Sequence, residues 1–323
     1  MNHFLAIDAG GTKTQCLLAD ESRALARATT GTVKLMRVGE DEATARLQAM
    51  LAEVAASAGV PLSQITRTCF GLAGTRNPAA RAWASRVLSS SVAGELLICG
   101  DEEIALDAAF TGGPGILVVA GTGSNAIGRT DAGEVYGAGG WGPVLGDEGS
   151  GHWIGLEAIR AALRAHDREQ LSDATHVQTG IESTSLLREI ERHWGLNSLG
   201  ELVAYANQRG DTDHPAPEFA SLAPIVARCA EQGDALAAEV LNRAGVELAE
   251  LVALVFGKMA APPVPTLTAS PVIDIAFTGG VLTHIARVRD AMTARLSVLL
   301  PAANVRHSPV DPLEGALWRA RRG

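Results

Sequence analysis

Two stretches decide the fold: residues 4–20, FLAIDAGGTKTQCLLAD, and residues 116–131, ILVVAGTGSNAIGRTD. Each consists of an apolar, strand-like run, a bend rich in Gly and Thr, and a returning strand. The two stretches share this pattern with few identities, and the same order of events twice in one chain indicates a duplicated unit. Strand-like and helical segments alternate between them, which predicts an α/β layer.

Further elements are predicted outward from these stretches. A helix follows near Asp41, which can cap it, and Gly59 stops it. Strand, helix, strand and helix follow over 67–74, 78–90, 95–100 and 101–110, and residues 152–260 are mostly helical in period. The strand 272–277 leads through two glycines into a helix from Leu282 to about Leu299, and the tail 308–320 forms a last amphipathic helix. The Pro-containing stretches 211–217 and 261–271 are expected to be surface loops.

Composition excludes several classes of protein. The chain has 323 residues, with 27 basic and 36 acidic side chains and a net charge of −9, which argues against a nucleic-acid partner. This length favours two domains of roughly 100–200 residues. The four cysteines form no CxxC pair, so neither a zinc site nor a disulfide framework is predicted. With no signal peptide and no apolar run of about 18 residues, we expect a cytoplasmic protein without a membrane segment.

The first bend follows a carboxylate at the end of a buried strand. After Asp8 it contains Gly10, Gly11, Thr12, Lys13 and Thr14. Backbone N–H groups at glycines can face an anion without an obstructing Cβ, and the threonine hydroxyls add donors. The bend could therefore hold nucleotide phosphates, with Asp8 accepting hydrogen bonds from water on Mg²⁺. The alternative is an ordinary hairpin turn ending in a solvated aspartate.

Two further glycine segments also follow buried strands. They contain Gly121, Thr122, Gly123 and Ser124 in one case, and Gly279 and Gly280 in the other. Two related bends are what gripping phosphates from both sides requires. The flat backbone at Gly279 and Gly280 could pack against a purine ring, and close strand–helix packing explains the same glycines equally well.

A candidate catalytic carboxylate lies between these segments. Asp101 ends a strand and begins a helix, and transfer of a phosphoryl group to an alcohol needs a carboxylate within hydrogen-bond reach of the attacking hydroxyl. An Asp followed by two Glu at a helix start is also ordinary capping and dipole chemistry.

The segment 139–151, GGWGPVLGDEGSG, is the most unusual in the chain. Its candidate sugar-binding residues are Gly140, Trp141, Asp147 and Glu148. Carboxylates accept protons from sugar hydroxyls, and an aromatic ring covers an apolar sugar face. A structural turn with a serine cap for the next helix is the alternative.

Together these segments resemble the acetate and sugar kinase, heat-shock chaperone and actin superfamily. Within it, the chain resembles the N-acetylglucosamine kinase branch of the BadF/BadG/BcrA/BcrD ATPase-like family. AIDAGGTKT is similar to the first phosphate motif, AGTGSNAIGR to the second, and IDIAFTGGVL to the adenosine motif. The resemblance implies that Thr12 and Thr122 contact ATP phosphates and that Asp101 is the base for the sugar 6-hydroxyl. It also implies that Gly140, Trp141 and Asp147 bind the sugar.

The resemblance implies an α/β fold of two RNase H-like (actin-like ATPase) domains around a central cleft. The first domain would be 1–112, completed by the C-terminal helix 308–323, and the second 113–307 with a helical insertion. The implied activity is phosphorylation of the 6-hydroxyl of N-acetylglucosamine or a close amino sugar by ATP and Mg²⁺ in a homodimer. Glucosamine kinase, N-acetylmuramic acid kinase and an activator ATPase without sugar transfer are the alternatives.

The chain departs from this family pattern in two places. Lys34 stands where such kinases commonly have an asparagine that touches the sugar. Its side chain is either solvent-facing without a role, which long cations favour, or it favours an anionic sugar such as N-acetylmuramic acid. The clustered cysteines that hold iron–sulfur clusters in the activator ATPases are missing, as is the zinc motif of another bacterial sugar kinase group.

Overall fold

The computed structural model describes residues 2–75, 77–175, 184–210, 216–260 and 272–322. The chain divides into two compact units. The first unit comprises Met1–Leu117, Ile127–Tyr136 and Ser308–Gly323, and the second comprises Val118–Ala126 and Gly137–His307. The predicted domain bounds, 1–112 with 308–323 and 113–307, remain a prediction that limited proteolysis can test.

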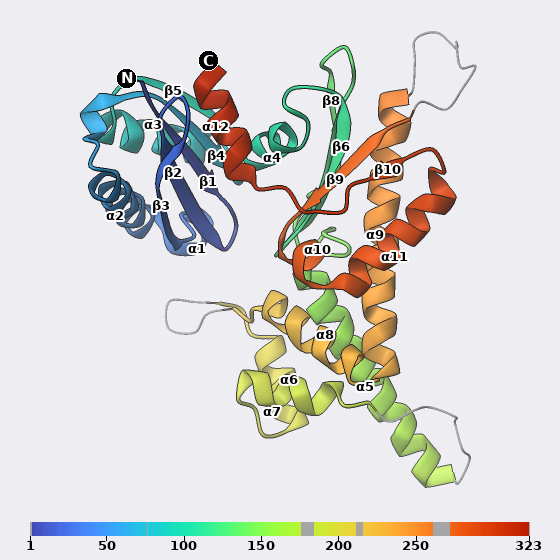
Figure 1. Cartoon of the computed structure of the whole chain (residues 1–323). Coiled ribbons are helices and arrows are strands. Elements are labelled where there is room, and N and C mark those ends of the chain that lie inside the picture. The colour runs from blue at the N-terminus through green and yellow to red at the C-terminus, as the bar shows by residue number, and fades with distance from the viewer. Residues whose placement is uncertain (1, 76, 176–183, 211–215, 261–271, 323) are drawn as a thin grey trace. The chain divides into compact units, whose positions relative to one another are not determined.

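The first sheet has five strands in the order β3-β2-β1-β4-β5 (Figure 1). These are β1 (His3–Ala9), β2 (Lys13–Ala19), β3 (Ala24–Gly31), β4 (Ile65–Leu72) and β5 (Glu95–Gly100). β1 pairs antiparallel with β2, and β2 with β3, while β4 lies parallel to β1 and β5 parallel to β4. The predicted meander therefore forms one side of the sheet, and parallel strands form the other.

Alternation along β1 separates two apolar layers. Leu5 and Ile7 belong to one buried cluster, and Phe4 and Ala6 to the other, as expected from the two-residue period of a strand. Helices α2 (Glu40–Ala58) and α3 (Pro78–Ser91) supply the first cluster, and α4 (Asp101–Phe110) and α12 (Pro312–Arg322) supply the second. Both faces of the sheet are thus covered, which suits its parallel strands.

The second sheet repeats this topology. Its order is β10-β9-β6-β7-β8. The strands are β6 (Gly115–Ala120), β7 (Ser124–Arg129), β8 (Val135–Gly139), β9 (Asp274–Thr278) and β10 (Asn304–Val305). On one side of β6 lie the next two strands of the chain, β7 and β8, and on the other side lie the later strands β9 and β10; β2, β3, β4 and β5 are arranged in the same way around β1. The predicted duplication and the α/β fold are confirmed.

The predicted helical region is also confirmed. It contains α5 (Gly151–Thr175), α6 (Leu186–Trp194), α7 (Leu199–Ala206), the short 3₁₀ helix η2 (Phe219–Leu222), α8 (Ala223–Glu231) and α9 (Ala235–Ala260). In the described ranges, no helix combines the length and apolar character that crossing a bilayer requires. The predicted loop 261–271 and residues 211–215 of the other predicted loop lie outside the described residues.

Two boundary predictions are wrong. Asp41 lies inside the first turn of α2, because Gly39 with φ 77° is the N-cap and joins α2 to the short helix α1 (Leu35–Val38). The helix predicted from Leu282 is two helices, α10 (Gly280–His284) and α11 (Ala286–Leu299), separated at Ile285. Ile285 is not helical there, with φ −107° and ψ 89°.

A side-chain hydrogen bond supports the break between α10 and α11, and a short turn precedes β4. Arg289 Nη1 donates to the carbonyl of Leu282 at 3.0 Å, which satisfies an acceptor at the end of α10. A 3₁₀ turn, η1 (Leu62–Gln64), leads into β4.

Candidate active site

Asp8 and Asp101 lie at one edge of the first sheet. Asp8 pairs in register with Gly71 of β4, and Gly71 pairs with Cys99 of β5. Asp101 follows β5 directly, as the first residue of α4. Because the carboxyl ends of parallel strands meet at the same edge, both aspartates lie there, with β4 between β1 and β5.

Burial and like charge alter both carboxyl groups. Burial raises the pKa of Asp8 to about 6, with a further rise from the negative charge of Asp311 and an opposing effect of Lys13. Burial also raises the pKa of Asp101 well above its ordinary value, and Glu102 and Asp8 raise it further. A carboxyl group with a raised pKa takes up a proton more readily, which is the property of a general base.

Asp101 is not the N-cap of α4. Gly100 is the N-cap of α4, and its N–H donates to Glu103 Oε1 at 3.0 Å. The helix is fixed farther along by Asp107, which is 1% exposed and accepts from Arg129 Nη2 at 2.6 Å and from Arg319 of α12. The carboxylate of Asp101 is therefore supported by a helix that other residues cap and anchor.

The first glycine bend is closed by the N–H of Gly10, which donates to Lys13 O at 3.0 Å. A Cβ on Gly11 would meet no described atom within 4 Å, so the backbone is open to a ligand there. Thr12 and Lys13 are exposed at the bend, whereas Thr14 is fully buried. Thr14 pairs with Ala9, so its side chain lies on the sheet face opposite to that of Asp8.

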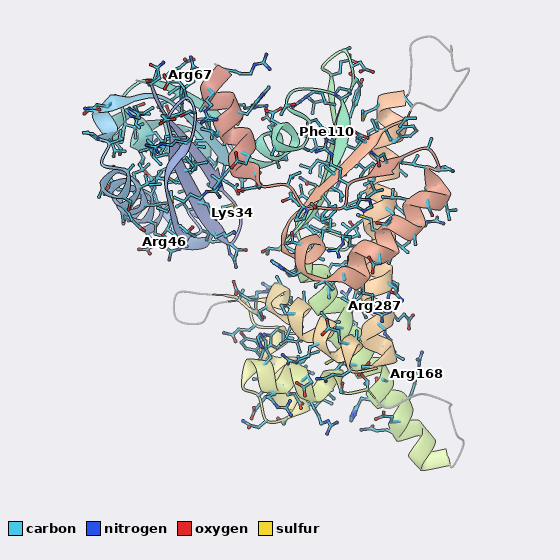
Figure 2. All side chains as sticks on the ribbon, viewed as in Figure 1. Lys34, Arg46, Arg67, Phe110, Arg168 and Arg287 are labelled. Carbon is cyan, nitrogen blue, oxygen red and sulfur yellow. The ribbon has the colours of Figure 1, made fainter. Side chains whose placement is uncertain are left out.

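Lys34 belongs to a segment that is tied to this bend. Thr32 Oγ1 donates to Gly10 O at 3.0 Å and accepts from the backbone N–H of Lys34 at 3.1 Å. Arg37 Nη1 donates to Gly11 O at 2.9 Å, and Arg46 Nη1 to Thr32 O at 2.9 Å. Lys34 and Arg46, both labelled in Figure 2, thus belong to one connected region of the first unit.

The second unit brings two other glycine segments together. The bend 121–124 is closed by Gly121 N–H, which donates to Gly123 O at 2.9 Å. A Cβ on Gly121 would lie 3.9 Å from Gly280 N, so these two segments are neighbours. A Cβ on Gly279, which has φ 94°, would lie 2.3 Å from Ala120 O, whereas one on Gly280 would meet no described atom within 4 Å. Close packing therefore explains Gly279, and Gly280 leaves open backbone.

The sugar-loop candidate, residues 139–151 (hereafter the glycine loop), ends in a serine cap as predicted. Ser150 Oγ accepts from the N–H of Trp153 at 3.2 Å, at the start of α5. Gly140 has φ 72° and Asp147 has φ 60°, a conformation that costs energy for a residue other than glycine. Trp141 is 68% exposed, so its ring is accessible for contact with a ligand.

Asp147 is held inside the glycine loop. It is 7% exposed, and its Oδ1 accepts from the N–H of Gly142 at 3.3 Å. Burial raises the pKa of Asp147, while the backbone N–H groups of Gly142 and Ser124 and the nearby His152 oppose the rise. Glu148 is half-buried, and its backbone carbonyl accepts from Ser124 Oγ at 2.7 Å.

Asn125 is a candidate that the sequence analysis missed. Its Oδ1 is buried and has no hydrogen-bond partner in the described part of the chain. A Cβ on Gly140 would lie 3.3 Å from Asn125 Cβ, so the amide lies beneath the glycine loop. A buried amide oxygen without a partner is costly unless a ligand or water binds it. The polar residue directly after the second bend was the available signal.

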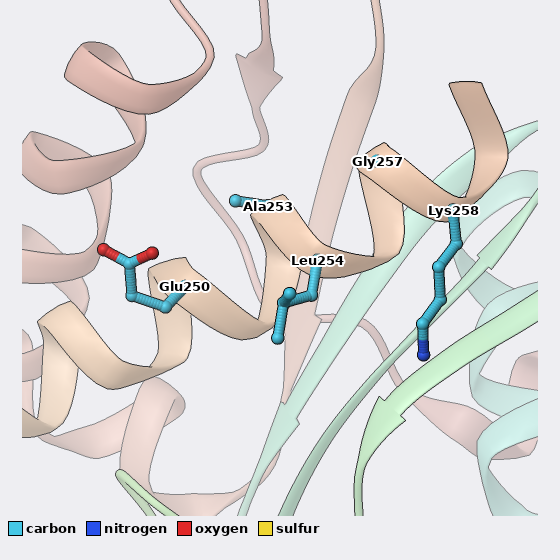
Figure 3. A pocket seen from close by; sticks show the side chains of 5 residues that line it. All are labelled: Glu250, Ala253, Leu254, Gly257 and Lys258. Carbon is cyan, nitrogen blue, oxygen red and sulfur yellow. The ribbon is translucent and has the colours of Figure 1, made fainter. Parts of the chain in front are cut away.

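A hollow of about 430 Å³ lies on α9, and none of its lining residues is a predicted site residue. Its lining residues are Glu250, Ala253, Leu254, Gly257 and Lys258, all from this one helix (Figure 3). Lys258 Nζ is already bonded to Gly137 O at 2.6 Å. Because a catalytic site needs polar groups that converge from several elements, we assign no function to this hollow.

The fold defines an α/β protein with two five-stranded sheets of equivalent strand order. Residues 5–320 match the BadF/BadG/BcrA/BcrD ATPase family, and the chain belongs to that family.

Curated relatives match the chain over nearly its whole length. It is 28% identical to the N-acetylmuramic acid/N-acetylglucosamine kinase of Clostridium acetobutylicum, over 99% of each chain. It is 26% identical to the N-acetyl-D-glucosamine kinase of Dictyostelium discoideum, over 97% of this chain and 96% of that one.

Solved structures share the fold. A crystal structure from Chromobacterium violaceum, provisionally named an N-acetylglucosamine kinase, is 25% identical with a TM-score of 0.72, and 98% of each chain is covered. A ROK family glucokinase from Streptomyces griseus has a TM-score of 0.55 at 16% identity, with 100% of each chain covered, which supports the shared fold alone.

Proposed function

We propose that this protein transfers the terminal phosphoryl group of ATP to the 6-hydroxyl of N-acetylglucosamine or a closely related amino sugar. The observation that carries the proposal is the position of Asp101, a half-buried carboxylate with a raised pKa, directly after β5 and at the start of an anchored helix. The family and the two kinase relatives support the same activity.

In the proposed reaction, Asp101 accepts a hydrogen bond from the sugar hydroxyl and takes its proton as the oxygen attacks the phosphorus. The new bond joins that oxygen to the terminal phosphorus, the bond to the bridging oxygen breaks, and ADP leaves. Asp101 is suited to this step because like charge at Asp8 and Glu102 favours its protonated form. The anchoring of α4 keeps the carboxylate in place.

The residues present fit ATP with Mg²⁺. Gly11 and Gly280 offer open backbone at two of the glycine segments, and backbone N–H groups at such positions bind phosphate oxygens. Asp8 is a half-buried carboxylate with a raised pKa, and a cation would stabilise its charge. We propose that Thr12 and Thr122 contact the phosphates and that Asp8 holds Mg²⁺ through water, as such sites commonly do. When bound, the ion neutralises charge on the phosphates.

The remaining residues of the glycine segments are proposed to support the nucleotide-binding backbone. We propose that Gly10, Lys13, Gly121 and Gly123 shape the two nucleotide-binding bends through their backbone hydrogen bonds, and that Gly279 supports that backbone by packing. Thr14 is buried on the other sheet face, so we propose that it supports the bend from beneath.

The glycine loop is the proposed sugar site. Its exposed ring at Trp141, the backbone of Gly140 and the carboxylates of Asp147 and Glu148 are the contacts that a sugar would use. Asn125, with its unpartnered amide oxygen, is added to this set. Lys34 is proposed to favour an anionic sugar such as N-acetylmuramic acid, and the name of the Clostridium acetobutylicum relative supports this extension.

The direct test measures ADP release with Mg²⁺-ATP and a panel of sugars. The panel contains N-acetylglucosamine, glucosamine, N-acetylmuramic acid, N-acetylgalactosamine, glucose and a tube without sugar. We expect strong stimulation by N-acetylglucosamine, by N-acetylmuramic acid or by both. Equal release in every tube, including the one without sugar, would contradict the sugar kinase and favour an activator ATPase.

The proposal extends to assembly and place of action. We propose a homodimer in the cytoplasm, where ATP is available, because the family resemblance implies both. Light scattering on the purified protein tests the first, and a monomer at working concentrations would exclude it.

A further inference from the structure

We propose that Ser124 is a positioning residue that couples sugar binding to nucleotide binding. This inference rests on the proposed function, in which the glycine loop binds the sugar and the bend 121–124 binds ATP phosphates. Its basis is a set of hydrogen bonds that join these two segments inside the second unit. Through them, a ligand that orders one segment also orders the other.

Ser124 itself makes the central connections. It is 4% exposed, and its Oγ donates to Glu148 O at 2.7 Å. Its backbone carbonyl accepts from the N–H of Gly140 at 3.0 Å. A hydroxyl has one proton to donate, and in Ser124 this proton is directed to the glycine loop. The side chain of Ser124 therefore joins two segments instead of donating to a phosphate.

The other residues of the bend make similar connections. The N–H of Gly151 donates to Gly121 O at 2.8 Å, and that of His152 donates to Thr122 O at 3.3 Å. A Cβ on Gly123 would lie 2.8 Å from Asp147 Oδ2, so the carboxylate lies against the bend. All four residues of the bend thus contact the glycine loop or the first residues of α5, and neither segment can shift alone.

These connections have a thermodynamic consequence. Holding the glycine loop in the one conformation that a ligand binds costs conformational entropy, and glycine-rich backbone loses the most. A first ligand that orders the loop removes part of that cost for a second ligand, and the coupling must be reciprocal. The sugar should therefore tighten nucleotide binding by the same factor by which the nucleotide tightens sugar binding.

The test measures this factor by titration calorimetry in the full-length protein. The probes are the sugar that stimulates ADP release most and AMPPNP with Mg²⁺, each titrated with and without the other. We expect the wild type to show a factor of about 5 or more in both directions, a typical coupling strength. Ser124→Ala should bring both factors close to one. If Ser124→Ala does not fold, Ser124→Cys keeps a similar volume and a much weaker donor.

The matched control is Ser150→Ala. Ser150 is a buried serine of the same loop, but its hydroxyl caps α5 and does not join the two segments. We expect this variant to lose stability and to keep the wild-type coupling factor. If Ser124→Ala loses the coupling and Ser150→Ala does not, the loss at Ser124 is not a general effect of lower stability.

The outcomes separate the coupling from the proposed function. An active kinase whose wild-type factor is one, or whose Ser124→Ala and Ser124→Cys variants keep the wild-type factor, overturns the coupling alone. Failure of every sugar in the panel to bind overturns the proposed function together with the coupling.

Discussion

Asp101 is the residue on which the proposed chemistry depends. Asp101→Asn keeps the shape of the side chain and removes its ability to accept a proton. We expect kcat for sugar phosphorylation to fall by about 10²-fold or more, the usual contribution of a general base, while ATP still binds. ADP release with the best sugar of the panel, together with calorimetric titration of AMPPNP, measures both effects.

Asp41→Asn is the matched control for this variant. Asp41 is an exposed carboxylate in the first turn of α2, as Asp101 is in the first turn of α4, and both interact with the positive end of a helix dipole. The control should keep wild-type kcat. An Asp101→Asn enzyme with the kcat of the control would rule out a role for Asp101 as the base.

Asp8 makes the stability of the protein without ligands depend on pH. Its pKa is raised from 3.8 to about 6, so the folded protein binds this proton more tightly than the unfolded chain does. The stabilising contribution is complete below the unfolded value and is lost as the pH rises through about 6. We expect Asp8→Asn to raise the free energy of unfolding at pH 7.5 by up to about 3 kcal/mol and to change it little at pH 4.

Asp20→Asn should change the free energy of unfolding at neutral pH in the opposite direction to Asp8→Asn. Backbone N–H groups of Ser22 and Arg23 lower the pKa of Asp20 to about 2, so its contribution is present at neutral pH and lost in acid. Urea unfolding of Asp8→Asn between pH 4 and 8, and of Asp20→Asn between about pH 2 and pH 7, checks both directions. A lower stability of Asp8→Asn than of the wild type at pH 7.5 would show that the charge of Asp8 is compensated in the folded protein.

At the scale of elements, α12 determines where α4 lies, the helix that begins with the proposed base Asp101. A Cβ on Gly315 would lie 1.8 Å from Ile104 O and 2.5 Å from Ala108 N, so the two helices touch through backbone. Gly315→Ala must push α12 and α4 apart. We expect a loss of about 1–3 kcal/mol in the free energy of unfolding, and a lower kcat because α4 begins with Asp101.

Gly257→Ala is the control for this change. Gly257 is also a helical glycine, in α9, and a Cβ there meets no described atom within 4 Å. Alanine should stabilise this helix by roughly 0.5–1 kcal/mol. Urea unfolding and kcat of both variants test the pair, and equal effects at the two positions would contradict the close contact at Gly315.

Particular elements also show where the sequence was sufficient. The period of the apolar residues predicted α9 and the strands around both bends, since burial dictates that pattern. It could not show the break at Ile285, because the apolar spacing continues across it and the freed carbonyl of Leu282 is satisfied by Arg289. Gly39 is the N-cap of α2 and has a positive φ, which cannot be read from a sequence. Asp41, two residues later, is a residue type that commonly caps helices, so the sequence favoured it instead.

At the scale of the whole molecule, the duplication was visible as two similar hairpins, and both sheets confirm it. The position of β4 beside β1, and of β9 beside β6, depends on connections that skip strands and was not predicted. The candidate site likewise has a part that the sequence predicted and a part that it did not. The glycines and carboxylates were found from residue type, whereas the hydrogen bonds of Ser124 and the unpartnered amide of Asn125 depend on contacts between distant segments.

The packing of α12 on the first sheet has a consequence for synthesis of the protein. Leu313 and Leu317 cover Phe4 and Ala6, which leave the ribosome some 300 residues earlier. Until then, one apolar face of that sheet has only α4 as part of its cover, and exposed apolar surface of this kind promotes aggregation. The growing chain therefore presents a binding surface for chaperones through most of translation, and the second unit has the residues it needs before the first does.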